Sequence, residues 1–536
     1  MNKKRLPKST YPNRYEIELD VDLDNFSYTG AQKVDLNVVE ATNNIVLNSV
    51  GIEVTKAKIQ TTKQDIPLEV NYIEEDEKIV FESQETLSEG VYELYLEFNS
   101  EITNDLKGFY KSSYMSEDGE KKWIATTQFE PTAARSAFPC WDEPEYKAIF
   151  SMTIITDEKY LRVSNEMVVE EEKVENNKLR TKFADSMKMS SYLVAFVIGD
   201  LEATVVGKSK TTDIRIIHRP GFSHQTSYAG TAAIKLLDFF EDYYKIPYPG
   251  TKLDLIAIPD FAMGAMENVG AVTFRENLLL FDKDKATRSE LDRSITVIAH
   301  ELAHMWFGDL VTMKWWDGIW LNEAFASLME VIASYNTYPE FKQWNAMNMS
   351  RTAGFSIDSL ENSRPVEFDV ETPDQAEEMF DVLTYEKGST VLRMFQMFIG
   401  EEAFQNGVEA YLNKFKFENT NSSDLWDALS EASNQPLNKI LPFWIREKGY
   451  PFLQVDCSNN FLTIKQKPFL LKNVETDKNN IKPVPVQIKF LDTGNEEKFL
   501  LDEAERVIDL KNLGEVPHIN SGGWGFFHTF YDDEVF

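Results

Sequence analysis

Hydrophobic and polar residues alternate along the first part of the chain. The alternation is strict from Tyr15 to Leu23 and returns at 34–38. Alternation with a period of two residues predicts strands with one buried and one solvent-exposed face. Further strand-like segments, separated by turn-forming residues, lie around 44–54, 78–82, 91–98, 148–155 and 191–198. We therefore expect residues 1–218 to form an N-terminal antiparallel β domain.

The pattern becomes helical after Arg219. Apolar residues recur at helical spacing from about 225 to 245, and helical segments dominate to about 447, apart from strand-like segments at 253–258 and 269–274. Alternation returns after Gly449 and is clear at 484–490, where Pro485 favours an edge strand. We expect a mostly helical domain at 219–447 and a small β-sandwich at 448–536, which together make a multidomain α+β fold.

Composition narrows the classes of partner. The chain has 536 residues and a net charge of -33, which argues against nucleic acid or an anionic membrane as partners. The same charge suits cationic groups such as the amino terminus of a peptide, although high solubility is the simpler explanation. The sequence has two distant cysteines, no apolar run of 18 residues and no apolar segment after its basic start. We expect no transmembrane helix, no secretory signal and a reducing, cytoplasmic compartment, with the oligomeric state open.

Two of the six histidines, His300 and His304, lie four positions apart, with Glu301 between them. On a helix these positions share a face, so both imidazoles can bind one metal ion and Glu301 can reach a water on that metal. Eighteen residues separate His304 from Glu323, which opens a second apolar segment. Antiparallel packing of the two helices would bring Glu323 towards the histidines. Two His and one Glu leave a position open for water, so we expect one catalytic Zn²⁺ per chain.

The flanking sequence supports a helix for the histidine pair. Thr287 and Glu290 have capping-box spacing, and apolar residues recur at spacings of four, three and four from Leu291 to Leu302. Gly308 offers a stop just past the expected end of the helix. The histidines lie off the apolar stripe, so this helix is expected to face a core on one side and a site on the other.

Three other segments carry candidate chemistry. The segment Gly264–Asn268 follows a strand-like segment and could pair with a peptide backbone, with Glu267 near the peptide's amine. Glu130 could be a second anchor for that amine, and Tyr385 opens an apolar helix that is expected to run to about Ile399. A phenol near the metal could donate to an oxyanion. From the residues alone, ordinary loops and one tyrosine among 21 are the better explanation of these segments.

The order and spacing of these motifs resemble the M1 family of zinc aminopeptidases. The resemblance covers essentially the whole chain, and it includes 128–131, 140–144, 258–261 and 385–388. It implies an N-terminal β domain, a thermolysin-like catalytic domain and a small β-sandwich. The implied zinc ligands are His300, His304 and Glu323.

The resemblance also implies roles for single residues. Glu301 would be the general base, Tyr385 would stabilise the transition state, and Glu267 and Glu130 would hold the α-amine of a peptide with a free amino terminus. Met263 is a candidate for the pocket of the first side chain. The expected substrate-binding residues are Gln128, Glu130, Met263, Gly264, Ala265, Met266, Glu267 and Asn268.

The chain departs from the family pattern in two places. Ala324 stands where a glycine is usual, and the chain stops at Phe536 where most members continue into a helical domain, so we expect a short form without that domain. Two alternatives stay open: an epoxide hydrolase-aminopeptidase of the leukotriene hydrolase type, which usually has Gly in place of Ala265, and a catalytically silent scaffold. The sequence does not predict the preferred N-terminal residue or the biological substrate.

Overall fold

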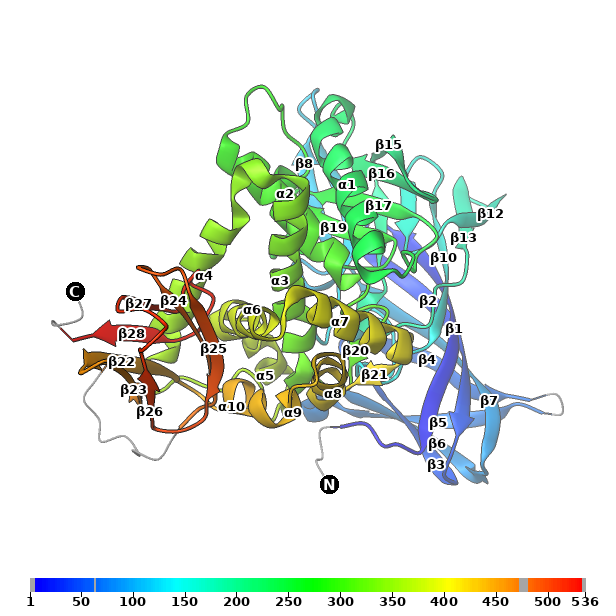
Figure 1. Ribbon diagram of the computed structural model, residues 1–536. Helices are drawn as coiled ribbons and strands as arrows, with labels where there is room; N and C mark the ends of the chain where they lie inside the picture. Colours follow the sequence, from blue (N-terminus) through cyan, green and yellow to red (C-terminus); the bar gives the residue numbers. More distant parts are fainter. Residues whose placement is uncertain (1–4, 62–63, 472–480, 533–536) are drawn as a thin grey trace. The chain divides into compact units, whose positions relative to one another are not determined.

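The structure, a computed structural model, describes residues 5–61, 64–471 and 481–532 (Figure 1). The chain groups into two compact units. The first unit contains Met1–Trp316, Glu371–Glu377 and Phe415–Asn419. The second unit contains Asp317–Val370, Glu378–Lys414 and Thr420–Phe536.

The largest sheet described in the first unit comes from the alternating N-terminal segments. β1 (Thr10–Asp22) buries Tyr15, Ile17 and Leu19 on one face, as its alternation predicts. It pairs antiparallel with β2 and parallel with β10, and the strand order is β12-β13-β10-β1-β2-β7-β4-β5-β6-β3. The other strands of this sheet are β2 (Ser27–Val38), β3 (Thr42–Asn48), β4 (Glu53–Gln60), β5 (Ile66–Ile73), β6 (Lys78–Leu87), β7 (Gly90–Glu101), β10 (Ile149–Asp157), β12 (Val168–Lys173) and β13 (Lys178–Phe183).

A smaller sheet of the same unit has the order β11-β14-β9-β8. Its strand β9 ends at Gln128, two residues before the predicted amine anchor Glu130. The strands are β8 (Gly108–Met115), β9 (Lys121–Gln128), β11 (Leu161–Ser164) and β14 (Phe196–Gly199).

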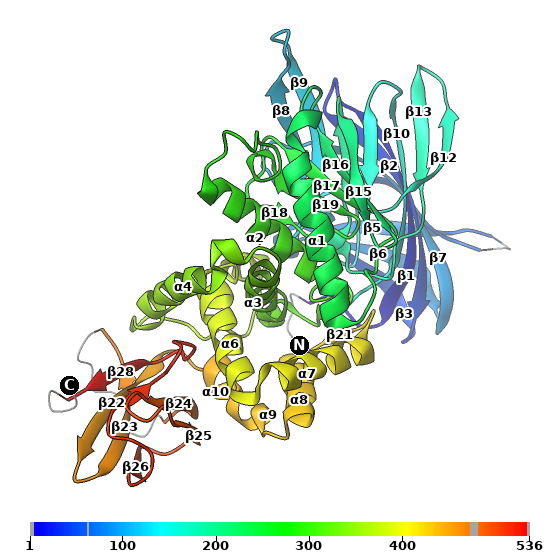
Figure 2. The same cartoon turned by 45° about the horizontal axis from the view of Figure 1, so that its top comes forward.

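A third sheet of this unit, in the order β15-β16-β17-β19-β18, supports the histidine helix. Every residue of β17 (Leu253–Ile258) is buried, because β16 and β19 both pair with it in parallel. α1 (Ser227–Tyr244) lies against β15 and β16, and α2 (Arg288–His304) packs on α1 (Figure 2). The sheet therefore joins strands on both sides of residue 218, where we expect a domain boundary. The remaining strands are β15 (Glu202–Ser209), β16 (Thr212–His218), β18 (Ala265–Met266) and β19 (Ala271–Arg275), and the short β20 (Thr312–Met313) follows α2.

Helices dominate the first part of the second unit. α3 (Trp320–Thr337) packs on α6 (Gly388–Ile399), and a π-helix at Leu383–Lys387 leads into α6. The predicted helix after Tyr385 thus ends at Ile399 as expected, but its first turn is a π-helix, which the apolar period did not indicate. The other helices are α4 (Gln343–Asp358), α8 (Ser422–Ser433), α9 (Leu437–Ile440) and α10 (Pro442–Ile445), while α5 (Pro373–Glu378), α7 (Glu401–Phe415) and β21 (Asn419–Thr420) contain residues of both units.

Two small sheets end the second unit, with the orders β26-β23-β22-β28 and β25-β24-β27. Pro485 lies in β24, which pairs with β25 there but reaches β27 only at Ile488–Phe490. Pro485 therefore lies at a local edge, although β24 is the middle strand of its sheet. The strands are β22 (Tyr450–Ser458), β23 (Phe461–Phe469), β24 (Val484–Phe490), β25 (Glu496–Leu501), β26 (Glu505–Asp509), β27 (Pro517–Ile519) and β28 (His528–Tyr531).

The multidomain α+β fold class is confirmed, with β-rich N-terminal and C-terminal parts around a helical middle. Two details differ from the prediction. The pairing of β1 with β10 is parallel, and 191–198 opens with a helical turn at Ser191–Leu193, because the Ser191 hydroxyl donates to Asp142. No helix among the described residues is long and apolar enough to span a membrane.

Candidate functional site

The helix α2 presents the histidine pair. The Thr287 side chain accepts from the Glu290 backbone N–H, and the Glu290 carboxylate accepts from the Thr287 N–H at 2.8 Å, so the predicted capping box is confirmed. The helix ends at His304 rather than close to Gly308, since the following residues turn to bring Phe307 and Val311 together. The helix therefore ends a few residues before the stop that Gly308 offers.

The two imidazoles lie together at the end of this helix. The ring centroids of His300 and His304 are 4.7 Å apart, and one ligand nitrogen of each lies within 4.8 Å of the other. Nδ1 of His304 is 2.9 Å from the Phe307 carbonyl oxygen. A proton on Nδ1 satisfies that carbonyl, and in this tautomer Nε2 carries the lone pair that can bind a metal. Glu301 is only 5% exposed, so the pair and the candidate base fit a metal site that is largely shielded from water.

Part of the segment 264–268 adopts the expected extended backbone. Ala265 and Met266 form β18, and the Gly264 carbonyl accepts from the Arg275 N–H at 2.9 Å. Glu267 is buried, whereas Met263 is 46% exposed. Pairing with β19 thus fixes the backbone of this segment and leaves Met263 open. Asn268 is buried too, and its amide donates to the Thr273 hydroxyl at 3.3 Å.

Two carboxylates of the first unit lie beside the histidine pair. One oxygen each of Glu130 and Glu267 lie within 4.8 Å of one another, and Glu267 Oε1 is 3.9 Å from Nδ1 of His304. Gln128 lies next to the same segment, with its Nε2 3.4 Å from the Met266 sulfur. Two acidic groups at this separation can hold an ammonium between them.

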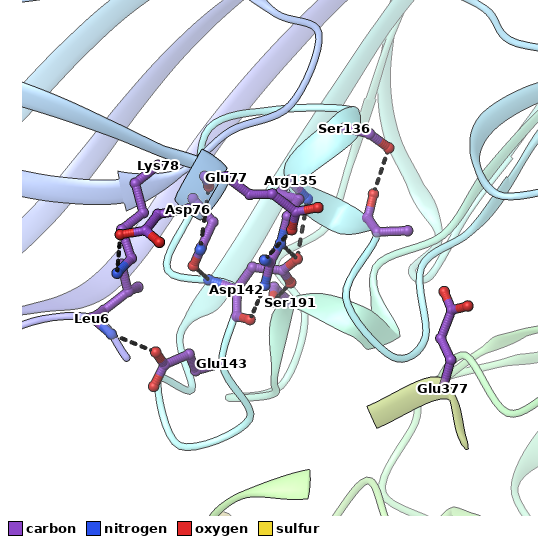
Figure 3. A network of polar contacts seen from close by, with 12 residues as sticks. Leu6, Asp76, Glu77, Lys78, Arg135, Ser136, Asp142, Glu143, Ser191 and Glu377 are labelled. Atoms are coloured by element: carbon purple, nitrogen blue, oxygen red, sulfur yellow. Dashed lines mark hydrogen bonds and ion pairs between the residues drawn. The ribbon is translucent and has the colours of Figure 1, made fainter. Parts of the chain in front are cut away.

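A polar network holds the loop that carries Glu130 (Figure 3). Arg135 donates from Nε to Asp142 at 2.9 Å and from Nη1 to Glu77 at 2.7 Å, and the Ser191 hydroxyl donates to the other oxygen of Asp142 at 2.7 Å. These groups are mostly buried, so the loop is anchored on both sides. The acidic stretch around Asp142 therefore supports the loop rather than offering acids to a substrate.

The remaining predicted residues belong to the second unit. Glu323 is buried in the first turn of α3, and Tyr385 is half-buried in the π-helix. The Asp381 carboxylate accepts from the Leu383 and Thr384 N–H groups and is paired with Arg364, which fixes the start of that π-helix. His300, His304 and Glu323 stay the predicted zinc ligands, and their side chains are of the types that zinc takes in hydrolases.

Two buried charged residues near the histidines had no signal in the sequence pattern. Asp309 is fully buried, and neither carboxylate oxygen has a hydrogen-bond partner among the described residues. Burial, together with nearby Glu267, raises the pKa of Asp309 well above its ordinary value. The buried Lys147 donates to the carbonyls of Asp309 and Leu310, at 3.0 and 3.3 Å, and burial lowers its pKa to about 7. Asp309 belongs to the turn that follows α2, and Lys147 is hydrogen-bonded to that turn.

A helix with two histidines four residues apart and a glutamate between them is characteristic of metallopeptidases. The family comparisons agree: the Peptidase family M1 domain matches residues 228–444, and the Peptidase M1 N-terminal domain matches residues 11–193. The chain belongs to the M1 peptidase family.

Curated relatives align along nearly the whole chain. Aminopeptidase M1 of Arabidopsis thaliana is 40% identical over 99% of this chain, and Aminopeptidase M1-A of Oryza sativa subsp. japonica is 38% identical over 99%. Puromycin-sensitive aminopeptidase of Caenorhabditis elegans is 37% identical over 99%. This chain covers 62%, 61% and 57% of those proteins, respectively.

Proposed function

We propose that this chain is a zinc-dependent aminopeptidase that removes N-terminal residues from peptides. The observation that carries the proposal is the approach of Glu267 to His304, 3.9 Å from carboxylate oxygen to ring nitrogen, with Glu130 close to Glu267. An ammonium site next to a metal-binding helix favours an exopeptidase over an endopeptidase. The aminopeptidase names of the relatives support the same activity.

The proposed roles follow from the chemistry of each side chain. His300, His304 and Glu323 would hold the zinc, which when bound would lower the pKa of a coordinated water to about 7. Glu301 would accept the proton of that water and pass it to the leaving amine.

The substrate would be held by groups on both sides of the scissile bond. Glu267 and Glu130 would fix its ammonium, and the extended backbone at Gly264 and Ala265 would pair with its chain. The Tyr385 hydroxyl would donate to the oxyanion. Met263, half exposed beside this segment, would contact the first side chain.

The test combines metal content with turnover of amino-acid anilides. We expect one zinc per chain by elemental analysis and hydrolysis of several amino-acid p-nitroanilides. Glu301→Gln should keep its zinc and lose nearly all turnover, because only the base is removed. The matched control is Glu290→Gln on the same helix, since glutamine also serves in a capping box. A zinc-loaded wild-type chain that hydrolyses no anilide of a broad panel would overturn the proposal, as would full activity in Glu301→Gln.

A further inference from the structure

The first unit contains a cavity whose lining residues include none from α2. It has a volume of about 600 Å³, within the range of small-molecule sites. Its lining residues come mainly from β11, β12, β13, β15 and β16. None of the residues assigned above to metal, base or substrate lines it, so the proposed peptidase chemistry does not explain it.

Arg162 in β11 offers an open hydrogen-bonding edge in this cavity. Its side chain is only 7% exposed. Nη1 donates to the Asp157 carbonyl at 3.1 Å, but Nε has no hydrogen-bond partner in the described part of the chain. Nη2 forms a long ion pair with Glu171 Oε1 at 3.9 Å, too far for a hydrogen bond. Nε and Nη2 together form the edge through which arginine binds a carboxylate with two parallel hydrogen bonds. A buried guanidinium with that edge free is costly unless an anion occupies it.

The other two cations of the cavity already have their anion. Arg215 donates from Nε and Nη2 to the two oxygens of Asp254, both at 2.7 Å. Lys252 donates to Asp254 at 2.8 Å and to two backbone carbonyls. Asp254 is fully buried and neutralises both cations at close range. Glu166, Glu171 and Asp213 also line the cavity, but Glu171, the ion-pair partner of Arg162, lies beyond hydrogen-bond distance from it. Among the described lining residues, Arg162 is therefore the cation that can take an external anion.

Apolar side chains form much of the remaining wall. Because they offer no hydrogen bonds to an inorganic anion, a ligand with an apolar body fits this cavity better. These side chains are Leu161, Val163, Met167, Phe183, Val205 and Ile217. We propose that this cavity binds a small organic carboxylate with an apolar body, its carboxylate on the Nε–Nη2 edge of Arg162. Two sources share this chemistry: a free medium-chain carboxylate, and the carboxyl-terminal residue of an apolar peptide.

The test measures binding by calorimetry with one probe for each source. Octanoate represents the free carboxylate, N-acetylphenylalanine represents the carboxyl-terminal residue, and N-acetylphenylalanine amide is the neutral control. We expect at least one of the two acids to bind and the amide to bind at least tenfold more weakly. Arg162→Gln should weaken binding of that acid at least tenfold. Arg180→Gln should leave it unchanged, because Arg180 in β13 pairs with Glu18 and does not line the cavity.

A second variant decides the matter if Arg162→Gln does not fold. Val168 in β12 lines the cavity and is 45% exposed, so Val168→Trp would fill space without removing a polar contact. It should also weaken binding at least tenfold. Failure of both acids to bind, or binding that survives both Arg162→Gln and Val168→Trp, would overturn the proposal. Anilide hydrolysis plays no part in this result, so it stands apart from the test of the peptidase activity.

Discussion

Tyr385 is held in place by a buried ion pair whose removal should have a large effect. Nζ of Lys387, at the end of the π-helix, is 2.8 Å from Asp358 Oδ2, and both side chains are 0% exposed. The other oxygen of Asp358 accepts from the Gly449 N–H at 2.8 Å and from the Ser363 hydroxyl at 3.0 Å. Burial lowers the pKa of Lys387, and the Asp358 carboxylate opposes that shift.

The informative perturbation is Asp358→Asn, because asparagine keeps the acceptor for Gly449 and Ser363 and removes only the charge. Removing one partner of a fully buried pair costs about 3–5 kcal/mol, since the other charge stays in the interior. The double variant Asp358→Asn with Lys387→Met removes both charges and should recover most of that loss. Glu496→Gln serves as the control in the same unit, because its pair with Lys489 is long and exposed and should contribute little.

Urea unfolding followed by tryptophan fluorescence measures these differences, with the same transition compared in every variant because two units can unfold separately. Anilide turnover should fall in Asp358→Asn and return in part in the double variant, since Tyr385 lies two residues before Lys387. A loss of less than about 1 kcal/mol in Asp358→Asn would refute the reasoning. So would a double variant that is no more stable than Asp358→Asn.

Three further predictions concern the proposed site and its support. Tyr385→Phe should lower kcat by roughly 10²–10³, the usual cost of one oxyanion donor, and an anilide kcat within about twofold of wild type would assign that role to another residue. Glu267→Ala should reduce kcat/KM for free-amine peptides strongly, and the wild type should not cleave their N-acetylated forms, as mass spectrometry of the products would show. Burial lowers the pKa of Lys147 to about 7, below the ordinary lysine value of 10.5, so the unfolded chain binds more protons between these values. Its contribution to stability should rise with pH across that window, by up to about 1.4 kcal/mol per pH unit, and the difference in unfolding free energy between wild type and Lys147→Met should be flat below pH 7.

Local chemistry explains which features could be predicted from the sequence. The capping box at Thr287 and the buried strand Leu253–Ile258 depend on neighbouring residues, so spacing was sufficient. The helix end at His304 depends on the bridge between Phe307 and Val311, which the Gly308 signal does not contain. The π-helix at Tyr385 was missed for a similar reason, because its start is fixed by Arg364 and Asp381, whose pairing is not visible in a periodic pattern.

In the candidate site, too, local spacing predicts some residues and misses others. His300, Glu301 and His304 can be predicted because their spacing along the sequence places both imidazoles on one face of a helix. Lys147 lies 162 positions before Asp309 and meets the turn that follows the helix only in the fold, through the carbonyls of Asp309 and Leu310. Neither partner is a carboxylate, so no charge pattern marks the contact. Buried contacts of this kind become visible only once distant segments are brought together.

The sheet that supports α2 limits how the chain can be divided for experiments. The family matches end at residue 193 and resume at residue 228, yet β15 and β16 lie in between and complete that sheet. A fragment that begins after His218 would expose the backbone edge of β17, whose residues are all buried in the intact chain. Such an edge can pair with another molecule and aggregate. A fragment meant to carry the metal helix alone therefore has to start before Glu202, inside what the sequence comparison treats as a connection.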